Sequence, residues 1–387
     1  MKIAMVFDGL QFGGIERVGI DYARLFSQLG HEVSIFNLQP QLNDMEPEFG
    51  KDYKLNHVSM SRWLAPERYA ATLKKTWWGK FIYPIAFLLV SAINVVFRPI
   101  IRAKNSSFDI AIAFSGHMND LTFVADSFIK STHKIAWLHG ALYGYAIISP
   151  GFLRLYSKIK NLVSLSDSCD AELYSFMQEQ HIHKQTIYNP IYITEKEIDE
   201  NKVSLLKEQY KDFCLMVARL DDDKDQKTAI DAIKILNEKY GFDKKILFVG
   251  DGKNREELEK YIQSQNMEQY AFLEGKRADV QNYYSAASVY VHSSPLEGLP
   301  TVLLEAMSYH LPIATTDSIP GVREILRNNE FGLISSVYDA EGLADNIYRL
   351  YTDPELRKNL TDAADERIKD FSPEAIKGKI ENYISSL

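Results

Sequence analysis

The chain has 387 residues, more than one hydrophobic core usually organises, so two domains of ordinary size are expected. With 46% apolar and 25% charged residues, the composition excludes a disordered or fibrous protein, and the net charge of −8 argues against general affinity for nucleic acid. The two cysteines, Cys169 and Cys214, match no metal-ligand spacing, which argues against a zinc site or a disulfide scaffold and favours a reducing cytoplasm.

The first elements along the chain predict a βαβ unit. The opening residues lack the basic segment and the cleavage site of a secretion signal, so they are interpreted as a strand. The expected order is a strand, a loop containing Gly9, Gly13 and Gly14, a helix and a second strand, at 2–7, 9–14, 16–29 and 32–38. Asp8, directly after the first strand, is interpreted as a strand-end cap.

The strands that follow predict two parallel sheets in succession. Short apolar strands alternate with helices, which is typical of doubly wound α/β domains. In the first half they are expected at 110–114, 134–138 and 161–165, and in the second at 213–217, 245–249, 271–273, 289–292 and 312–315. Asn189-Pro190 and the polar segment to about Lys207 are interpreted as the linker.

The segment 51–104 is basic and aromatic. Its ten basic and two acidic residues give it a charge of +8, which leaves −16 for the rest of the chain. Residues 81–97 form a run of 17 residues without a charge, just below the length that spans a bilayer as a helix. Trp77, Trp78 and the basic flanks favour an interfacial segment on an anionic membrane surface. A buried helix and a true membrane span are the alternatives.

The most informative stretch is 293–307, SSPLEGLPTVLLEAM, in which a strand ends in a Gly/Pro turn that opens a helix. Backbone N–H groups at a helix start carry partial positive charge, so a diphosphate can rest against Leu299, Pro300 and Thr301 without a metal ion. Glu297 and Glu305, eight positions apart, lie on nearly the same face and can hold the hydroxyls of a sugar and of a ribose. By spacing alone, the simpler interpretation is that Glu297 is a turn residue and Glu305 is a solvent-exposed helix position.

Several blocks together resemble family 4 glycosyltransferases, which are retaining enzymes of the GT-B fold. Glu297-Gly-Leu-Pro-Thr-Val-Leu-Leu-Glu305 resembles the E-x7-E signature of that family. Further blocks agree in order and spacing, and they are Val217-Ala-Arg-Leu-Asp-Asp-Asp-Lys224, Leu247-Phe-Val-Gly-Asp-Gly252, Gly275-Lys-Arg-Ala-Asp279-Val, Trp137-Leu-His139-Gly, 164–168 and Tyr188-Asn-Pro190. The resemblance covers nearly the whole chain and is weakest from 42 to 109.

This resemblance implies two Rossmann-like, doubly wound domains that face each other across a cleft. The expected domains are 1–192 for the acceptor and 193–370 for the nucleotide sugar, and a final helix, 371–387, crosses back to the first. The implied donor-binding residues are Gly13, Gly14, Arg219, Lys224, Gly252, Lys276, Glu297, Gly298, Leu299, Pro300, Thr301 and Glu305. The implied acceptor-binding residues are Gly14, Glu16 and His139, and the implied catalytic residues are His139, Glu297, Arg219 and Lys224.

The implied chemistry needs no metal ion. Departure of a nucleoside diphosphate develops negative charge, which Arg219 and Lys224 can stabilise. Asp221 to Asp223 has the D-x-D spacing of metal-dependent transferases, but three acids between two cations fit an exposed turn better, so no metal or other cofactor is expected. By the resemblance, Glu305 binds the ribose hydroxyls, Glu297 binds the donor sugar, and the leaving phosphate deprotonates the acceptor hydroxyl. No G-x-G-x-x-G follows the first strand, which argues against a dinucleotide site.

The expected function is retaining transfer of a hexose or N-acetylhexosamine from a nucleotide diphosphate sugar, with a UDP-sugar favoured. The expected acceptor is lipid-linked or a glycan, in bacterial surface polysaccharide or glycolipid synthesis, and the basic segment suggests a cytoplasmic enzyme on the inner face of the cell membrane. A nucleotide-sugar epimerase or a phosphorylase of the same fold, or a scaffold without activity, are the alternatives. The sequence leaves the donor base, the sugar, the acceptor and the oligomeric state open.

Overall fold

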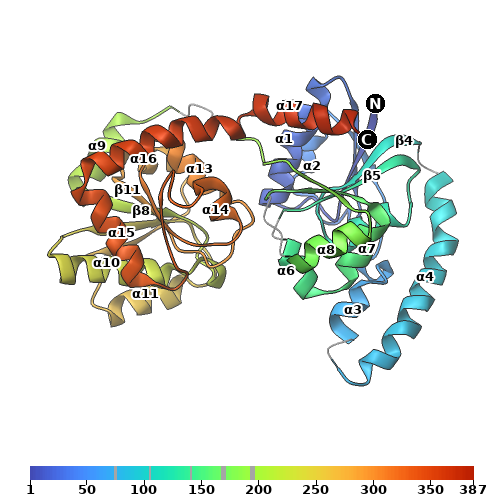
Figure 1. Cartoon of the computed structure of the whole chain (residues 1–387), viewed down its shortest axis with the longest axis horizontal. Coiled ribbons are helices and arrows are strands. Elements are labelled where there is room, and N and C mark those ends of the chain that lie inside the picture. The colour runs from blue at the N-terminus through green and yellow to red at the C-terminus, as the bar shows by residue number, and fades with distance from the viewer. Residues whose placement is uncertain (74–75, 104–105, 140–141, 167–170, 192–196) are drawn as a thin grey trace. The chain divides into compact units, whose positions relative to one another are not determined.

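The computed structural model describes the chain except for residues 74–75, 104–105, 140–141, 167–170 and 192–196 (Figure 1). Cys169, Lys74, Lys75 and Lys104 therefore lie outside the described residues. The chain forms two compact units. Unit 1 comprises Met1–Pro190 with Pro373–Leu387, and unit 2 comprises Ile191–Ser372.

Unit 1 is built on a seven-stranded parallel sheet of order β3-β2-β1-β4-β5-β6-β7. Strand β1 is buried from Ile3 to Phe7, because helices cover a doubly wound sheet on both faces and its strands become continuous apolar runs. The strands are β1 (Lys2–Phe7), β2 (Glu32–Asn37), β3 (Lys54–His57), β4 (Phe108–Ala113), β5 (Ser131–Trp137), β6 (Asn161–Ser164) and β7 (His183–Thr186). The helices are α1 (Gly14–Gln28), α2 (Glu46–Phe49), η1 (Arg62–Leu64), α3 (Arg68–Leu73), α4 (Gly79–Ala103), α5 (Met118–Ala125), α6 (Leu142–Ile148), α7 (Gly151–Ile159), α8 (Ala171–Glu179) and α17 (Pro373–Ser385).

Unit 2 repeats this plan with a six-stranded parallel sheet of order β10-β9-β8-β11-β12-β13. Its core joins apolar side chains of the strands to those of α10 and α15, among them Ile230 and Ile347. The strands are β8 (Phe213–Val217), β9 (Lys245–Val249), β10 (Ala271–Gly275), β11 (Val289–His292), β12 (Ile313–Thr316) and β13 (Leu333–Ser335). The helices are α9 (Glu200–Tyr210), η2 (Asp222–Lys224), α10 (Gln226–Tyr240), α11 (Arg255–Ser264), α12 (Val280–Ala286), α13 (Thr301–Ser308), α14 (Gly321–Leu326), α15 (Ala340–Thr352), α16 (Pro354–Arg367) and η3 (Ile368–Phe371).

The two predicted parallel α/β sheets are confirmed, and three short edge strands, β3, β7 and β13, had escaped the sequence analysis. These strands have only three or four residues, and β3 and β7 carry no fully buried position, so no apolar run marks them. The polar segment interpreted as a linker to about Lys207 is wrong from Glu200 onward. There α9 begins, and the Asp199 side chain caps it by accepting the backbone N–H of Asn201.

The strand orders place a topological switch point in each sheet. In unit 1 the chain order reverses between β1 and β4, and in unit 2 between β8 and β11. Open α/β sheets bind ligands outside the carboxyl ends of the strands at such points, because the connections on the two sides diverge there. Each unit therefore has one edge at which a polar site is expected.

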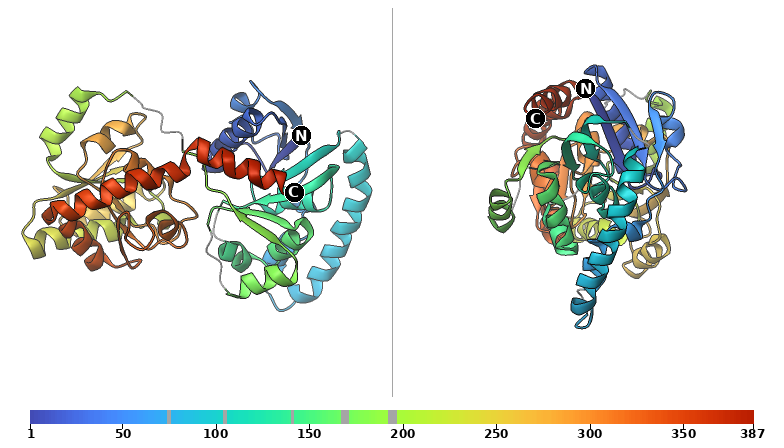
Figure 2. Two further views of the ribbon diagram at one scale, coloured as in Figure 1. Left: turned by 45° about the horizontal axis from the view of Figure 1, so that its top comes forward. Right: turned by 90° about the vertical axis from the view of Figure 1, so that its right-hand side faces the viewer.

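Helix α4 projects as one long helix from the rest of unit 1 (Figures 1 and 2). Its stretch Gly79–Arg102 spans 24 residues and is long and apolar enough to cross a membrane, with a mean hydropathy of 2.0 and 11% of that window buried. The uncharged run 81–97 is thus part of a longer apolar helix than the sequence indicated. The alternative of an ordinary buried helix is wrong, because most of its surface is exposed.

The polarity of α4 is the reverse of that of a soluble amphipathic helix, which turns its apolar face to the protein. Tyr83 and Asn94 face the protein, where the Tyr83 hydroxyl donates to Glu67 Oε2 at 3.0 Å and Asn94 Nδ2 donates to the Leu64 carbonyl at 2.9 Å. Leu88 and Leu89 are 67% and 62% exposed. The outer face of α4 is therefore an apolar surface that no described residue covers.

Candidate donor and acceptor sites

Lys224 and Glu297 form an ion pair at the switch point of unit 2. Lys224 ends η2, which follows β8, and Glu297 lies in the turn after β11, the neighbouring strand. Lys224 Nζ donates to Glu297 Oε1 at 2.7 Å, and Asp223 Oδ2 lies 3.5 Å from the same nitrogen. The fold thus brings together two predicted site residues that are 73 positions apart in the chain.

His292, the last residue of β11, is a member of this cluster that sequence reasoning missed. Its ring is buried, Nε2 lies 3.8 Å from Glu297 Oε1, and neither ring nitrogen has a hydrogen-bond partner among the described residues. Burial lowers the pKa of His292 to about 4, against the opposing effect of Glu297, so the imidazole is neutral near pH 7. Its place at the carboxyl end of a strand, just before the Gly/Pro turn, was the signal available in the sequence.

The turn after β11 leads into the open N-terminus of α13. Pro300 is the N-cap residue and no side chain caps the helix, whose first residue is Thr301. Leu303 donates its backbone N–H to the Pro300 carbonyl, whereas the N–H groups of Thr301 and Val302 have no partner in the part of the chain that is described. Gly298 and the buried Leu299 form the turn itself. The free N–H groups supply the partial positive charge to which a phosphate binds.

Glu305 lies on α13, whereas Glu297 lies in the turn before it. The expectation that both glutamates share one helix face is wrong, because the helix begins only at Thr301 and Pro300 before it is extended. The Tyr284 hydroxyl donates to Glu305 Oε2 at 3.0 Å. Tyr284 is buried between two other aromatic rings, Tyr290 at 5.8 Å and Tyr309 at 5.3 Å between centroids. This packing fixes the tyrosine, so its hydroxyl holds the Glu305 carboxylate in one orientation.

Arg219 and the acidic run beside it pair with one another. Arg219 Nη1 lies 2.6 Å from Asp221 Oδ2 and Nη2 lies 3.4 Å from Asp223 Oδ2. Asp222 accepts from Lys253 Nζ at 2.6 Å and from Asn254 Nδ2 at 2.6 Å. The D-x-D carboxylates are therefore each paired with a cationic side chain, and within the described ranges no group of three or more His, Cys, Asp or Glu side chains has a metal-binding arrangement.

Gly252 and Lys276 follow the two outer strands β9 and β10 at the same edge of unit 2. A β-carbon on Gly252 would lie 2.4 Å from the Leu220 carbonyl oxygen, so only glycine fits this close approach of two loops. Lys276 is exposed. No contact of the described residues joins Lys276 to the Lys224–Glu297 pair.

His139 lies after β5 at the carboxyl edge of unit 1, as a strand-end position predicts. Its Nε2 donates to the Phe114 carbonyl at 2.7 Å, because a carbonyl can only accept, and its ring packs against Phe114. Burial lowers the pKa of His139 to about 4. The ring is therefore neutral near pH 7, and Nδ1 remains to accept a hydrogen bond.

The Gly13-Gly14 loop starts α1 at the same edge. Gly13 is the N-cap residue and Gly14 is the first residue of the helix. A β-carbon on Gly13 would lie 2.4 Å from Glu16 Oε2, so the absence of a side chain leaves room for this carboxylate to fold back over the loop. Burial raises the pKa of Glu16. Gly13 and Gly14, predicted for the donor, and Glu16, predicted with Gly14 for the acceptor, thus form one loop at the start of α1.

The interpretation of Asp8 as a strand-end cap is wrong, because its side chain is the centre of a buried polar cluster. Asp8 Oδ1 accepts from Gln39 Nε2 at 2.7 Å and from Asn119 Nδ2 at 2.8 Å, and Oδ2 accepts from Arg62 Nε at 3.1 Å. His117 Nδ1 lies 3.4 Å from Oδ2. Burial by itself would raise the pKa of Asp8, but contacts with His117, Asn119 and Arg62 outweigh it and the pKa is lowered.

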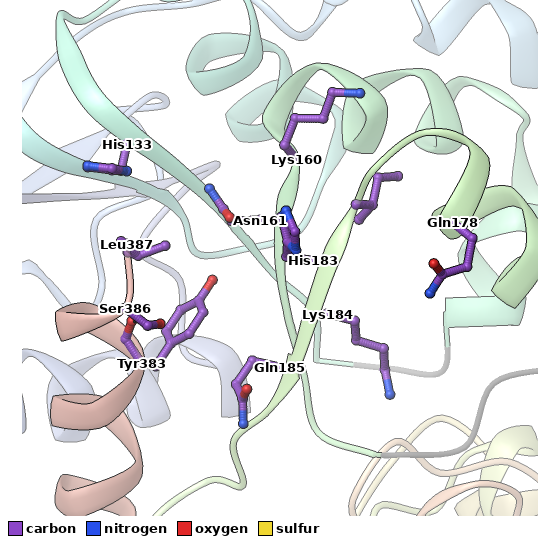
Figure 3. Close-up of a pocket in the computed structure, with 11 residues that line it drawn as sticks. His133, Lys160, Asn161, Gln178, His183, Lys184, Gln185, Tyr383, Ser386 and Leu387 are labelled. Atoms are coloured by element: carbon purple, nitrogen blue, oxygen red, sulfur yellow. The ribbon is translucent and has the colours of Figure 1, made fainter.

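A pocket of about 720 Å³ lies at the opposite edge of the unit 1 sheet (Figure 3). Asn161 and His183, the first residues of β6 and β7, line it together with Tyr383 of α17. Parallel strands present their amino ends there, whereas His139 and Glu16 lie at the carboxyl ends. This pocket is therefore separate from the predicted acceptor residues.

Two doubly wound units, of which the second holds a cation, two carboxylates and an open helix N-terminus, are the architecture of GT-B glycosyltransferases. The Glycosyl transferases group 1 family matches residues 197–367, nearly all of unit 2. The resemblance to family 4 glycosyltransferases is thereby confirmed, and the chain is a glycosyltransferase.

Relatives and solved structures extend the match over the whole chain. An amylovoran biosynthesis glycosyltransferase of Erwinia amylovora is 24% identical over 97% of both chains. An alpha-1,4-N-acetyl-D-galactosaminyltransferase of Campylobacter jejuni, named for a PP-undecaprenol-linked acceptor, is 26% identical over 97% of this chain and 96% of its own. The structure of HepE of Anabaena in complex with UDP matches over 100% of both chains with a TM-score of 0.72 and 19% identity. These matches confirm the predicted GT-B fold.

Proposed function

We propose that the enzyme transfers a hexose or N-acetylhexosamine, with retention of configuration, from a UDP-sugar to a lipid-linked or glycan acceptor in bacterial surface polysaccharide or glycolipid synthesis. The observation that carries the proposal is the cluster at the switch point of unit 2. There the Lys224–Glu297 pair lies beside the open N-terminus of α13, and Glu305 follows on the same helix. HepE, of the same fold, has been solved with UDP and UDP-glucose, which favours uridine as the donor base.

In this proposal each part of the cluster has a distinct role. The free N–H groups of Thr301 and Val302 bind the diphosphate, and Lys224 with Arg219 stabilises the charge that develops as it leaves. Glu297 holds the hydroxyls of the donor sugar, and Glu305, oriented by Tyr284, holds those of the ribose. Gly252 and Lys276 line the outer part of the donor site.

The acceptor binds to unit 1 through Gly14, Glu16 and His139. His139 contributes Nδ1 as a hydrogen-bond acceptor and supports the donor sugar in the transition state, since its Nε2–H is engaged with Phe114. Relatives named for a PP-undecaprenol-linked acceptor and for lipopolysaccharide core synthesis support a lipid-linked or surface-glycan acceptor.

The enzyme works in the cytoplasm on the inner face of the cell membrane, and α4 is its contact with lipid. Phe81 and Leu88 expose apolar surface, Trp77 adds an exposed aromatic ring, and Lys80 and Arg102 bracket the helix with cations for anionic headgroups. Contacts of Tyr83 and Asn94 hold α4 to the protein along its length. A spanning helix would carry Leu64 and its neighbours into the bilayer with their backbone groups, so an in-plane helix is favoured.

The donor site is tested by thermal stabilisation of the protein with UDP, GDP and dTDP, in EDTA and again in magnesium. Tight binding of one nucleotide raises the melting temperature, because the bound nucleotide stabilises the folded state. The gain in the free energy of unfolding is about 2.7 kcal/mol when the nucleotide concentration is one hundred times Kd. We expect a metal-independent shift with UDP that is lost in Glu305→Ala. No shift with any nucleotide, or a shift that needs magnesium, contradicts the proposal.

The membrane contact is tested by sedimentation with phosphatidylglycerol vesicles. Leu88→Gln with Leu89→Gln should weaken binding at least about tenfold, because each leucine contributes about 1.5–3 kcal/mol when buried in apolar surroundings. Leu205→Gln, an exposed leucine on α9, is the matched control. If the double variant binds vesicles like the wild type but has a different oligomeric state in solution, α4 is an interface between copies of the chain.

A further inference from the structure

Asp8 and His117 meet at the switch point of unit 1. Asp8 follows β1 directly and His117 follows β4, and these two strands are neighbours at which the chain order reverses. This is the position in unit 1 that corresponds to the Lys224–Glu297 pair in unit 2. None of the roles proposed above uses either residue.

The backbone at His117 is fixed from two sides. Gly116 has a φ of +66°, and a β-carbon there would lie 2.7 Å from the Trp137 carbonyl oxygen, so this position accepts only glycine. The buried Asp120 carboxylate accepts the backbone N–H groups of Gly116 at 2.9 Å and of His117 at 2.8 Å. The backbone that carries the imidazole is therefore held in one conformation at the N-terminus of α5.

The His117 ring turns one nitrogen inward and the other outward. Nδ1 faces Asp8 Oδ2 at 3.4 Å, and the side chain is half exposed. The Asp8 carboxylate is held by Gln39 and Asn119 on its other oxygen. A carboxylate that faces Nδ1 favours the tautomer with the proton on Nδ1, which leaves Nε2 as the acceptor.

Other charged and titratable groups surround this ring. They are Asp8 after β1, Glu16 on α1, Arg62 on η1, Asp120 on α5 and His139 after β5. The contact with Asp8 raises the pKa of His117, burial opposes this, and Asp120 adds to it while Arg62 reduces it. The net effect raises the pKa of His117 above its ordinary value of 6.5.

We propose that Nε2 of neutral His117 accepts a hydrogen bond from a hydroxyl of the acceptor sugar next to the one that attacks, and that Asp8 is the positioning residue that fixes the tautomer. The inference rests on the proposed function and names a residue of its acceptor site. His117 orients the acceptor through this neighbouring hydroxyl, so the proton of the attacking hydroxyl stays available to the departing phosphate and no proton is transferred to the ring. Protonation of Nε2 removes the acceptor, so use of the acceptor rises with pH.

The experiment compares His117→Gln, Asp8→Asn and a matched control, His57→Gln. His57 is an equally exposed histidine at the end of β3, and its Nε2 contacts Glu46 Oε1 at 2.8 Å. Initial rates are measured from pH 5.5 to 8.5 with saturating UDP-sugar and a short-chain prenyl-diphosphate N-acetylhexosamine as the acceptor probe. Stabilisation by UDP and release of UDP without acceptor report on the donor site of the same variants.

We expect His117→Gln to lower kcat/KM for the probe by about threefold to tenfold, the effect of one lost hydrogen bond, and to remove the acid limb of the pH profile. Asp8→Asn should shift that limb to lower pH, because the charge that favours the imidazolium is gone. UDP binding and UDP release should stay unchanged in both, and His57→Gln should match the wild type.

A wild-type profile in His117→Gln, or an unmoved acid limb in folded Asp8→Asn, overturns the inference while leaving the proposed function intact. Loss of UDP stabilisation in His117→Gln also overturns it, since the effect would then not be confined to the acceptor. If the wild-type enzyme binds UDP but transfers sugar to no prenyl-diphosphate or glycan probe, the proposed function fails and this inference fails with it.

Discussion

In unit 2 the two partners at the switch point are buried to the same degree, since 16% of the Lys224 side chain and 18% of the Glu297 side chain are exposed. In unit 1 the carboxylate is the buried partner, with 7% of Asp8 exposed, whereas 42% of Arg62 and 51% of His117 are exposed. Both clusters lie at the same place in the same type of sheet. They differ in which group is presented to a ligand.

This difference indicates how each unit meets its ligand. In the proposed donor site, a phosphate that binds Lys224 would compete with Glu297 for the same ammonium group, so the donor would break the existing pair and release Glu297 to bind a hydroxyl. In unit 1 the exposed Arg62 and His117 are held by the buried Asp8. A ligand can reach them without breaking an ion pair. We therefore expect changes in unit 2 to act through the donor and changes in unit 1 to act through the acceptor.

The largest expected effect comes from Lys224→Ala. It removes the cation that faces the leaving diphosphate and leaves Glu297 without its partner, so kcat should fall by about a hundredfold to a thousandfold. Lys253→Ala is the matched control, because the Lys253–Asp222 pair is exposed and such pairs contribute little. The measurement is UDP release with saturating donor and acceptor. Equal activity of the two variants would contradict the assignment of the donor site.

The second prediction uses the buried His292 of unit 2. Its folded pKa of about 4 lies below the ordinary 6.5, so the folded state binds this proton less tightly than the unfolded chain does. The stability that the neutral ring provides is complete above pH 6.5 and is lost as the pH falls toward 4, by about 3 kcal/mol in total. His292→Leu should therefore flatten the loss of stability over this range.

The check is urea unfolding at pH 7 and pH 5, followed through the transition that UDP shifts, which reports on unit 2. His310→Gln, an exposed histidine of the same unit, should keep the wild-type slope. A His292→Leu protein that loses as much stability as the wild type would show that other groups dominate the acid response of unit 2.

The smallest effect is expected for Tyr284→Phe, which removes the hydroxyl that orients Glu305. The ring remains in its aromatic stack, so the fold is retained and only one hydrogen bond, about 1 kcal/mol, is lost. UDP should bind about threefold to tenfold more weakly by titration calorimetry, with Tyr309→Phe unchanged as the control. An unchanged affinity for UDP in Tyr284→Phe would mean that the Tyr284 hydroxyl is not needed to orient the Glu305 carboxylate toward the ribose.

The sequence predicted the central strands of both sheets because each is a buried apolar run, as at Phe213–Val217. It also predicted the turn and the helix start at 293–305, because a strand end, a Gly/Pro turn and an apolar helix pattern follow one another within these 13 residues. The edge strands β3, β7 and β13 were missed, since β3 and β7 have no buried position and β13 has only three residues, too few to show an apolar run.

What the sequence determined by itself is therefore local: the strand and helix periods, the glycine turns and the block that resembles family 4 glycosyltransferases. Tertiary structure alone decided that Asp8 is a buried partner of His117 across 109 positions and not a cap, and that His292 lies behind Glu297. It also decided that α4 turns its polar residues inward. These outcomes depend on which strands become neighbours and which helix faces are covered, and long-range packing sets both.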